Sequence, residues 1–189
     1  GPEQLCMDLY DSPEQARQLI EIAVADFHPI YDRFHTILQD AGLPSICWVG
    51  IPLWGKFHVP SCDFSAMIST DHFVEFSLPA LRREVRSMTR NIYHVDGRGV
   101  ARHLDVILAE PDIHAIQWVQ EMGVCRPIMQ WVPLIKRIQA AGKGVIVDLQ
   151  TDELEPFMDA VEPRGIFLWI GAESEAEQRA ILKRVQQWR

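Results

Sequence analysis

Residues 91–97 read Asn-Ile-Tyr-His-Val-Asp-Gly, a β-rich run that ends in polar residues just before a helical run starting near Val100. This order predicts a strand followed by a helix, as in parallel α/β proteins. In such folds ligands bind at the carboxyl ends of the strands. His94 and Asp96 stand at that end, two positions apart, so both side chains can face one mouth. The alternative is that they only cap the following helix or bind backbone groups.

Strand and helix signals alternate along the rest of the chain. Ser12 and Pro13 are typical of a helix start, and apolar residues then recur at helical spacing to Gly42, with a kink expected at Pro29. Ser69 is placed to cap a second long helix. The predicted strands are residues 45–51, 91–95, 114–119, 144–149 and 165–170, and the predicted helices are residues 13–42, 69–88, 100–108, 127–141, 152–161 and 174–188.

Five strands, each followed by a helix, predict an α/β fold with a partial (β/α)8 barrel of about five parallel strands. The 189 residues, 48% of them hydrophobic, are enough for one sizeable core. We therefore expect a single domain over residues 3–189, and we interpret Gly1 and Pro2 as the remnant of a cleaved tag.

The charge balance excludes one class of partner. A net charge of -8 and a pI of about 5.3 argue against a nucleic-acid surface, which needs clustered lysine and arginine. No apolar run is long enough to span a bilayer, so no membrane partner is expected. The cysteines lie far apart without a CxxC pair and are expected to be reduced thiols in a cytoplasmic protein. They are Cys6, Cys47, Cys62 and Cys125.

The segment from Pro52 to Pro60 is rich in proline and glycine and is the longest irregular stretch. Long loops inside compact domains are usually lids or binding loops. Trp54 and His58 lie on this loop, and we expect them to close over the site and contact substrate. Packing of an exposed aromatic is the alternative.

Several motifs follow one another in a recognisable order: CDFSAMIS at 62–69, FVEFSLP at 73–79, IYHVDG at 92–97, HLD at 103–105 and IQWV at 116–119. Together they resemble the uroporphyrinogen decarboxylase superfamily, which comprises tetrapyrrole decarboxylases and cobalamin-linked methyltransferases with a shared (β/α)8 barrel. The resemblance extends from about Pro13 to the C-terminus and covers the later part of a family barrel. It implies an enzyme that acts on a tetrapyrrole, a corrinoid or a methylated small molecule.

The sequence departs from the family pattern in two places. The zinc-dependent methyltransferases of the family carry His-x-Cys where this chain has His94-Val95-Asp96, and a further cysteine where it has residues 170–172, Ile-Gly-Ala. The early barrel, which supplies the substrate-binding arginines and aspartate of the decarboxylases, has no counterpart here. The resemblance thus implies a zinc site with His94 and Asp96 as ligands, completed by a third protein ligand.

The candidate catalytic residues are His94, Asp96 and Asp63, and Gln117 is a candidate for orienting the substrate. The resemblance implies methyl transfer linked to a corrinoid or a thiol. The first alternative is decarboxylation of a tetrapyrrole, in which Asp63 or Asp96 would stabilise a protonated pyrrole-like centre. The second alternative is a binding or assembly module without catalysis.

Other polar residues have structural interpretations. His103 and Asp105 fall on a helical stretch and are expected to bind backbone or solvent, and Trp118 is expected in the core. A sheet of five strands leaves two unpaired edges, for which we expect residues 46–51 and 165–168 to be exposed. The sequence therefore predicts a homo-oligomer that covers these edges.

Overall fold

The computed structural model describes residues 1–121 and 126–188. Over these residues the strands form a single five-stranded sheet in the order β1-β2-β3-β4-β5, with each neighbouring pair parallel. The strands are β1 (Phe57–His58), β2 (Arg90–Asp96), β3 (Ala115–Val119), β4 (Gly144–Asp148) and β5 (Ile166–Trp169). Sequential parallel strands with right-handed crossovers place all the connecting helices on one face, as in a (β/α)8 barrel. The predicted α/β fold, a partial barrel with five parallel strands, is confirmed.

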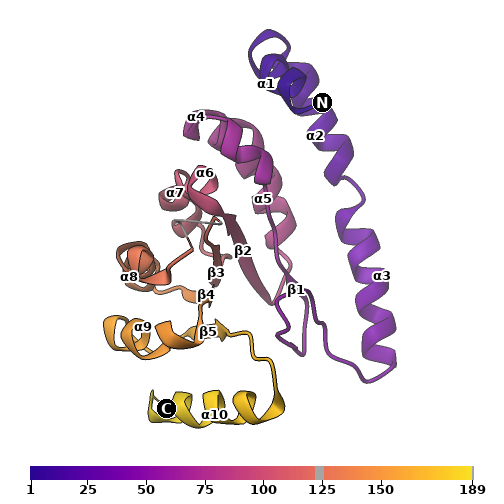
Figure 1. The fold of residues 1–189 in the computed structure, drawn as a ribbon. Helices are drawn as coiled ribbons and strands as arrows, with labels where there is room; N and C mark the ends of the chain where they lie inside the picture. Colours follow the sequence, from indigo (N-terminus) through magenta and orange to yellow (C-terminus); the bar gives the residue numbers. More distant parts are fainter. Residues whose placement is uncertain (122–125, 189) are drawn as a thin grey trace.

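The helices that connect the strands lie together on one side of the sheet (Figure 1). Between β2 and β5 they are α6 (Gly97–Ala101), α7 (Leu104–Leu108), α8 (Val132–Ala140) and α9 (Leu154–Ala160), and α10 (Glu175–Val185) follows β5. Short 3₁₀ turns precede α8 and α9 and follow α10, at η4 (Ile128–Trp131), η5 (Thr151–Glu153) and η6 (Gln186–Trp188). The main core lies between these helices and the sheet, where Tyr93, Ile116 and Trp118 are buried. Trp118 is a core residue, as predicted.

The first long predicted helix is two helices, α2 (Pro13–Val24) and α3 (Phe27–Asp40). The chain breaks before Phe27 rather than at Pro29. Pro29 lies in the first turn of α3, where a helix has no internal partner for the backbone N–H, so the proline causes no kink. A further helix that was not expected from the sequence, α1 (Pro2–Asp11), precedes them.

The second long predicted helix forms with an interruption. It consists of α4 (Thr70–His72), the π-helical segment η2 (Phe73–Ser77) and α5 (Leu78–Val85). Ser69 caps it as predicted, because its Oγ accepts a hydrogen bond of 3.2 Å from the backbone N–H of His72. The π-helical segment lies just before Pro79 in the chain. Proline has no backbone N–H to donate to the preceding turn, so the regular α-helical hydrogen bonds are interrupted there.

The predicted strand at residues 45–51 is wrong. Ser45 and Leu53 exchange two backbone hydrogen bonds of 2.9 Å in an antiparallel bridge, and between them the chain turns at Cys47–Gly50. Gly50 takes a φ of 74°, a conformation that suits glycine. We call residues 45–53 the 45–53 hairpin. The first strand is instead the short β1, inside the segment that was expected to be a lid.

The 45–53 hairpin covers the face of the sheet opposite the helices. Side chains alternate along a strand, so Tyr93 faces the helices while Ile92 and His94 face the other way. On that side Val49 of the hairpin is fully buried in a second core with Ile92 and Ile146. The hairpin therefore packs against the face of the sheet that the helices leave uncovered.

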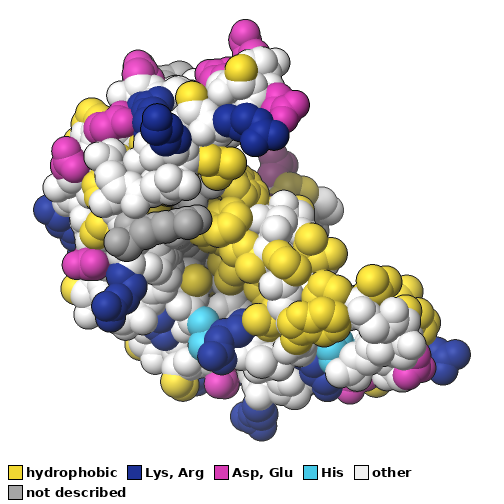
Figure 2. Space-filling model, turned by 90° about the horizontal axis from the view of Figure 1, so that it is seen from below, with side chains coloured by type: hydrophobic (Ala, Val, Ile, Leu, Met, Phe, Trp, Pro, Cys, Tyr) yellow, Lys and Arg dark blue, Asp and Glu magenta, His cyan; other side chains and the backbone are white. Residues whose placement is uncertain are grey.

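The sheet ends at β1 on one side and at β5 on the other. Phe167 of β5 is partly exposed, as expected, whereas residues 46–51 form no edge strand. Figure 2 shows hydrophobic side chains that continue from the hollow of the molecule onto a projecting lobe. Large apolar residues of α3 are exposed, among them Ile30, Phe34 and Ile37. The predicted homo-oligomer stays a prediction.

Two further expectations concern the described residues. Within residues 1–121 and 126–188, no helix has the length and apolar character that a membrane crossing requires. The cysteines Cys6, Cys47 and Cys62 are free thiols, as expected. Cys125 lies outside the residues that the structure describes.

Candidate metal centre

The carboxyl end of β2 brings a third acidic residue to His94 and Asp96. Ser61 forms a parallel bridge with His94, and the backbone N–H of His94 donates to the carbonyl of Pro60 over 3.0 Å. Asp63 and Asp96 each follow this bridged pair by two residues. Asp63 then begins the 3₁₀ turn η1 (Asp63–Met67). The local strand pairing thus holds three potential ligands together.

The three side chains form a compact cluster, which we call the Asp63–His94–Asp96 triad. One potential ligand atom from each residue lies within 4.8 Å of the other two. Both carboxylates are exposed to solvent and His94 is half-buried. His94 and Asp96 therefore converge at the carboxyl end of β2, as expected, and Asp63 joins them there.

Gln117 fixes the orientation of the imidazole. It lies opposite His94 in the β2–β3 register and is only 2% exposed. Its Oε1 lies 2.8 Å from His94 Nδ1 and 3.2 Å from Trp48 Nε1. An indole N–H can only donate, so the atom of Gln117 that faces it is the acceptor oxygen. His94 Nδ1 therefore carries the hydrogen, and Nε2 keeps the lone pair needed by a metal ligand or a base.

Trp48 is the component of the site that the sequence did not reveal. Its ring meets the His94 ring edge-on, with centroids 6.0 Å apart and planes at 86°. Trp169 anchors the same hairpin, because its Nε1 donates to the carbonyl of Val49 over 3.2 Å. The hairpin is therefore fixed to both β3 and β5 near the triad. Nothing local in residues 45–53 indicates these contacts.

The turn after Asp96 is also constrained. Gly97 has a φ of 70°, and a Cβ added there would lie 2.9 Å from Glu121 Cγ. Glu121 pairs with the guanidinium of Arg98 over 2.9 Å and also accepts from the backbone N–H of Arg98. Glycine at this position lets the chain leave β2 directly after Asp96 and enter α6.

Trp54 and His58 do not join the triad, which corrects the expected lid. His58 lies in β1 opposite Asn91, three residues before the Ser61 bridge, and its ring contacts Glu84 at 3.3 Å. The loop that carries Trp54 is held beside Thr89, which precedes β2. Both residues therefore lie toward the amino ends of the strands, whereas the triad lies at the carboxyl ends.

His103 has a structural role. It is fully buried and stacks on Phe73 with ring centroids 4.6 Å apart. Its nitrogens lie 2.9 Å from the carbonyl of Ser65 and 3.1 Å from Thr70 Oγ1. Burial lowers the pKa of His103 below the usual value. Asp105 forms an ion pair with Arg137 on the helical side, so both residues follow the structural interpretation.

The donor set of the triad is two carboxylates and one imidazole. Zinc accepts this combination, and catalytic zinc sites use three protein ligands with one open position. Cys62 does not add a thiolate: its Sγ lies 3.6 Å from Ser77 Oγ and burial raises the pKa of the thiol. The residues present therefore fit a divalent cation that tolerates oxygen ligands.

Comparison with protein-family models, with curated proteins and with solved structures finds no match for this chain. The resemblance to the uroporphyrinogen decarboxylase superfamily therefore stays a prediction from the sequence.

Proposed function

We propose that the chain binds a divalent cation, zinc in the first place, through Asp63, His94 and Asp96. We further propose that this cation serves methyl transfer on a small molecule. The observation that supports the metal site is the convergence of three ligand atoms within 4.8 Å at the carboxyl edge of a parallel sheet. The resemblance to the family's methyltransferases supports the choice of reaction.

Each residue of the site has a separate task. Asp63 and Asp96 supply two negative charges that balance the charge of the dication, and their exposure leaves room for a substrate. Gln117 holds the imidazole so that its Nε2 faces away from the amide. When bound, the cation would supply Lewis acidity, which lowers the pKa of a thiol or hydroxyl at its open position.

Methyl transfer is preferred over decarboxylation because the decarboxylase chemistry needs no metal, whereas the triad combines the ligand types that zinc accepts. Carboxylate oxygens replace the thiolates of the family pattern. Because oxygen is a harder ligand than sulfur, the site is expected to accept manganese as well as zinc. A corrinoid or another tetrapyrrole remains the proposed partner, on the resemblance alone. Cytoplasmic location is likewise part of the proposal.

Metal analysis tests the site. Purified protein is loaded with zinc, dialysed exhaustively and analysed for metal, and we expect about one zinc per chain. The variants His94→Ala and Asp96→Asn should lose it. Asp105→Asn is the matched control, because it removes an exposed carboxylate that pairs with Arg137 away from the triad. Equal zinc in all four proteins would refute the site.

An activity assay tests the reaction. Methylcobalamin and a small thiol are incubated with the zinc-loaded protein, and demethylation is followed in the visible spectrum of the corrinoid. We expect turnover that requires zinc and that His94→Ala abolishes. Full zinc occupancy without methyl transfer would refute this reaction and leave the metal site standing. A protein that binds neither zinc nor corrinoid would instead support the binding or assembly module.

A further inference from the structure

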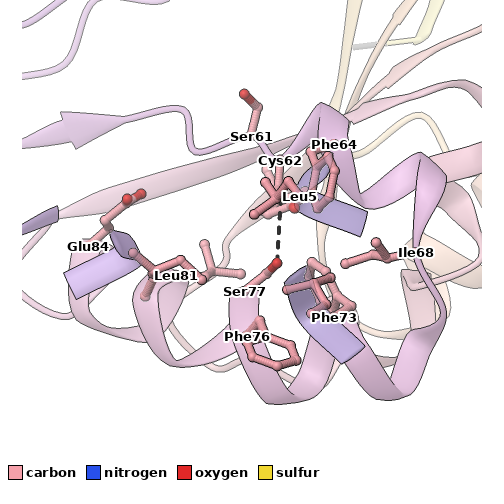
Figure 3. Close-up of a pocket in the computed structure, with 14 residues that line it drawn as sticks. Leu5, Ser61, Cys62, Phe64, Ile68, Phe73, Phe76, Ser77, Leu81 and Glu84 are labelled. Atoms are coloured by element: carbon pink, nitrogen blue, oxygen red, sulfur yellow. Dashed lines mark hydrogen bonds between the residues drawn. The ribbon is translucent and has the colours of Figure 1, made fainter. Parts of the chain in front are cut away.

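A cavity of about 190 Å³, partly open to solvent, lies on the opposite face of β2 from the triad. Apolar side chains from α1 and α2 line one part of it, and side chains from η2 and α5 line another. Figure 3 shows Leu5, Cys62 and Phe64 facing Phe73, Ser77 and Leu81 across the space. Its size is close to that of engineered cavities of about 150 Å³ that bind benzene.

One buried polar group in the wall has no partner. Tyr93 lines the cavity and is 1% exposed, and its hydroxyl makes no hydrogen bond within the described residues. Buried hydroxyls nearly always have a partner, because the lost hydration is otherwise not replaced. Burial also raises the pKa of Tyr93 far above its usual value, so the hydroxyl is neutral. A ligand with one polar group would satisfy it.

The other polar groups of the wall indicate the charge of that ligand. The Cys62 thiol and the Ser77 hydroxyl, 3.6 Å apart, are both neutral donors and acceptors. Glu84 lies at one end of the cavity and would repel an anion. Among the residues that the structure describes, no arginine or lysine lines the cavity to compensate a carboxylate or phosphate. The wall therefore suits an uncharged molecule.

We propose that this cavity binds a small, uncharged aromatic molecule whose single hydroxyl or carbonyl group pairs with the Tyr93 hydroxyl. This cavity is separate from the triad, although residues of β2 and of the segment that begins η1 contribute to both. Tyr93 and His94 are neighbours on β2 and face opposite sides, and Cys62 precedes Asp63 in the same way. The proposal does not rest on metal binding, and its test is run in the presence of a chelator.

Phenol is the probe, with toluene as the analogue that lacks the polar group. Titration followed by ligand-observed NMR and calorimetry should give saturable phenol binding on the order of millimolar. Tyr93→Phe should weaken phenol binding about tenfold, the upper range for one neutral hydrogen bond, and leave toluene binding unchanged. Ala80→Leu should abolish both, because Ala80 lines the cavity and the larger side chain fills it.

Cysteine labelling keeps the test independent of the variants. In the unaltered chain, saturating phenol should slow alkylation of Cys62, measured peptide by peptide, and leave Cys47 on the 45–53 hairpin unaffected. Absence of saturable binding and of Cys62 protection would overturn the proposal. Phenol binding that survives in a folded Ala80→Leu protein, or that Tyr93→Phe does not weaken relative to toluene, would overturn it as well.

Discussion

Replacing Gln117 by leucine removes the contact that orients His94 without opening a hole in the sheet. The side chain is 2% exposed, and leucine has a similar volume. The substitution leaves the His94 Nδ1–H and the Trp48 Nε1–H without their shared acceptor. Trp48 is 59% exposed, so water can replace its partner, whereas His94 is half-buried and loses its fixed ring orientation.

The size of the effect follows from these contacts. Removing a partner that orients a metal-binding histidine typically weakens metal affinity 10- to 100-fold. This corresponds to about 1.4 to 2.8 kcal/mol of zinc binding free energy. Loss of two hydrogen bonds, offset by the burial of apolar carbon, should change the free energy of unfolding by less than about 2 kcal/mol.

Competition with a chromogenic zinc chelator measures the affinity, and urea denaturation measures the stability. Gln139→Leu is the matched control, since Gln139 on α8 also makes two hydrogen bonds, both to the backbone of Glu162. We expect the control to keep wild-type zinc affinity. Gln117→Leu protein that is folded and binds zinc within about twofold of wild type would refute the assigned orientation of His94.

Three further predictions concern stability and assembly. Gly97→Ala should lower the free energy of unfolding by about 1–2 kcal/mol in urea denaturation, because alanine is strained at a φ of 70°; an unchanged midpoint would contradict this. The pKa of His103 is lower in the folded chain than in the unfolded chain, so as the pH falls the unfolded chain is protonated at His103 before the folded chain. The free energy of unfolding should therefore be constant above a pH of about 6.5 and decrease as the pH falls below it. His103→Gln should flatten that dependence, with the remainder from His114, whose pKa is also lowered by burial; an equally steep profile would exclude His103 as a cause. Light scattering at micromolar concentration should give a dimer or larger species, and Phe34→Glu should shift it toward monomer; a monomeric wild-type chain would rule out the oligomer.

The strands from β2 onward and most helices after them could be predicted, because each apolar run is followed by a capped or glycine-bounded helical run. The single helix expected at residues 100–108 is instead two short helices, α6 and α7. The 45–53 hairpin could not be predicted. Residues 46–51 are as apolar as a buried strand. They form a hairpin against the sheet because the chain turns at Gly50 and because Trp169, far away in the sequence, donates a hydrogen bond to Val49. Composition within the segment does not distinguish these outcomes.

The candidate site divides in the same way. His94 and Asp96 could be recognised because two positions apart on one strand is a local relation that fixes their common side. The contact of Trp48 with Gln117 joins residues far apart in the chain, so no spacing rule reveals it. Tyr93 likewise looks like an ordinary core residue in the sequence, and its unpaired hydroxyl becomes evident only from the packing around it.

The ligand set of the metal is the most direct test of the account. X-ray absorption at the zinc edge of the loaded protein should show only oxygen and nitrogen neighbours at about 2.0–2.2 Å. Asp96→Cys provides the positive control, because it should introduce a sulfur neighbour at about 2.3 Å. Sulfur around zinc in the unaltered chain, or a spectrum that Asp96→Cys does not change, would contradict binding by Asp63, His94 and Asp96.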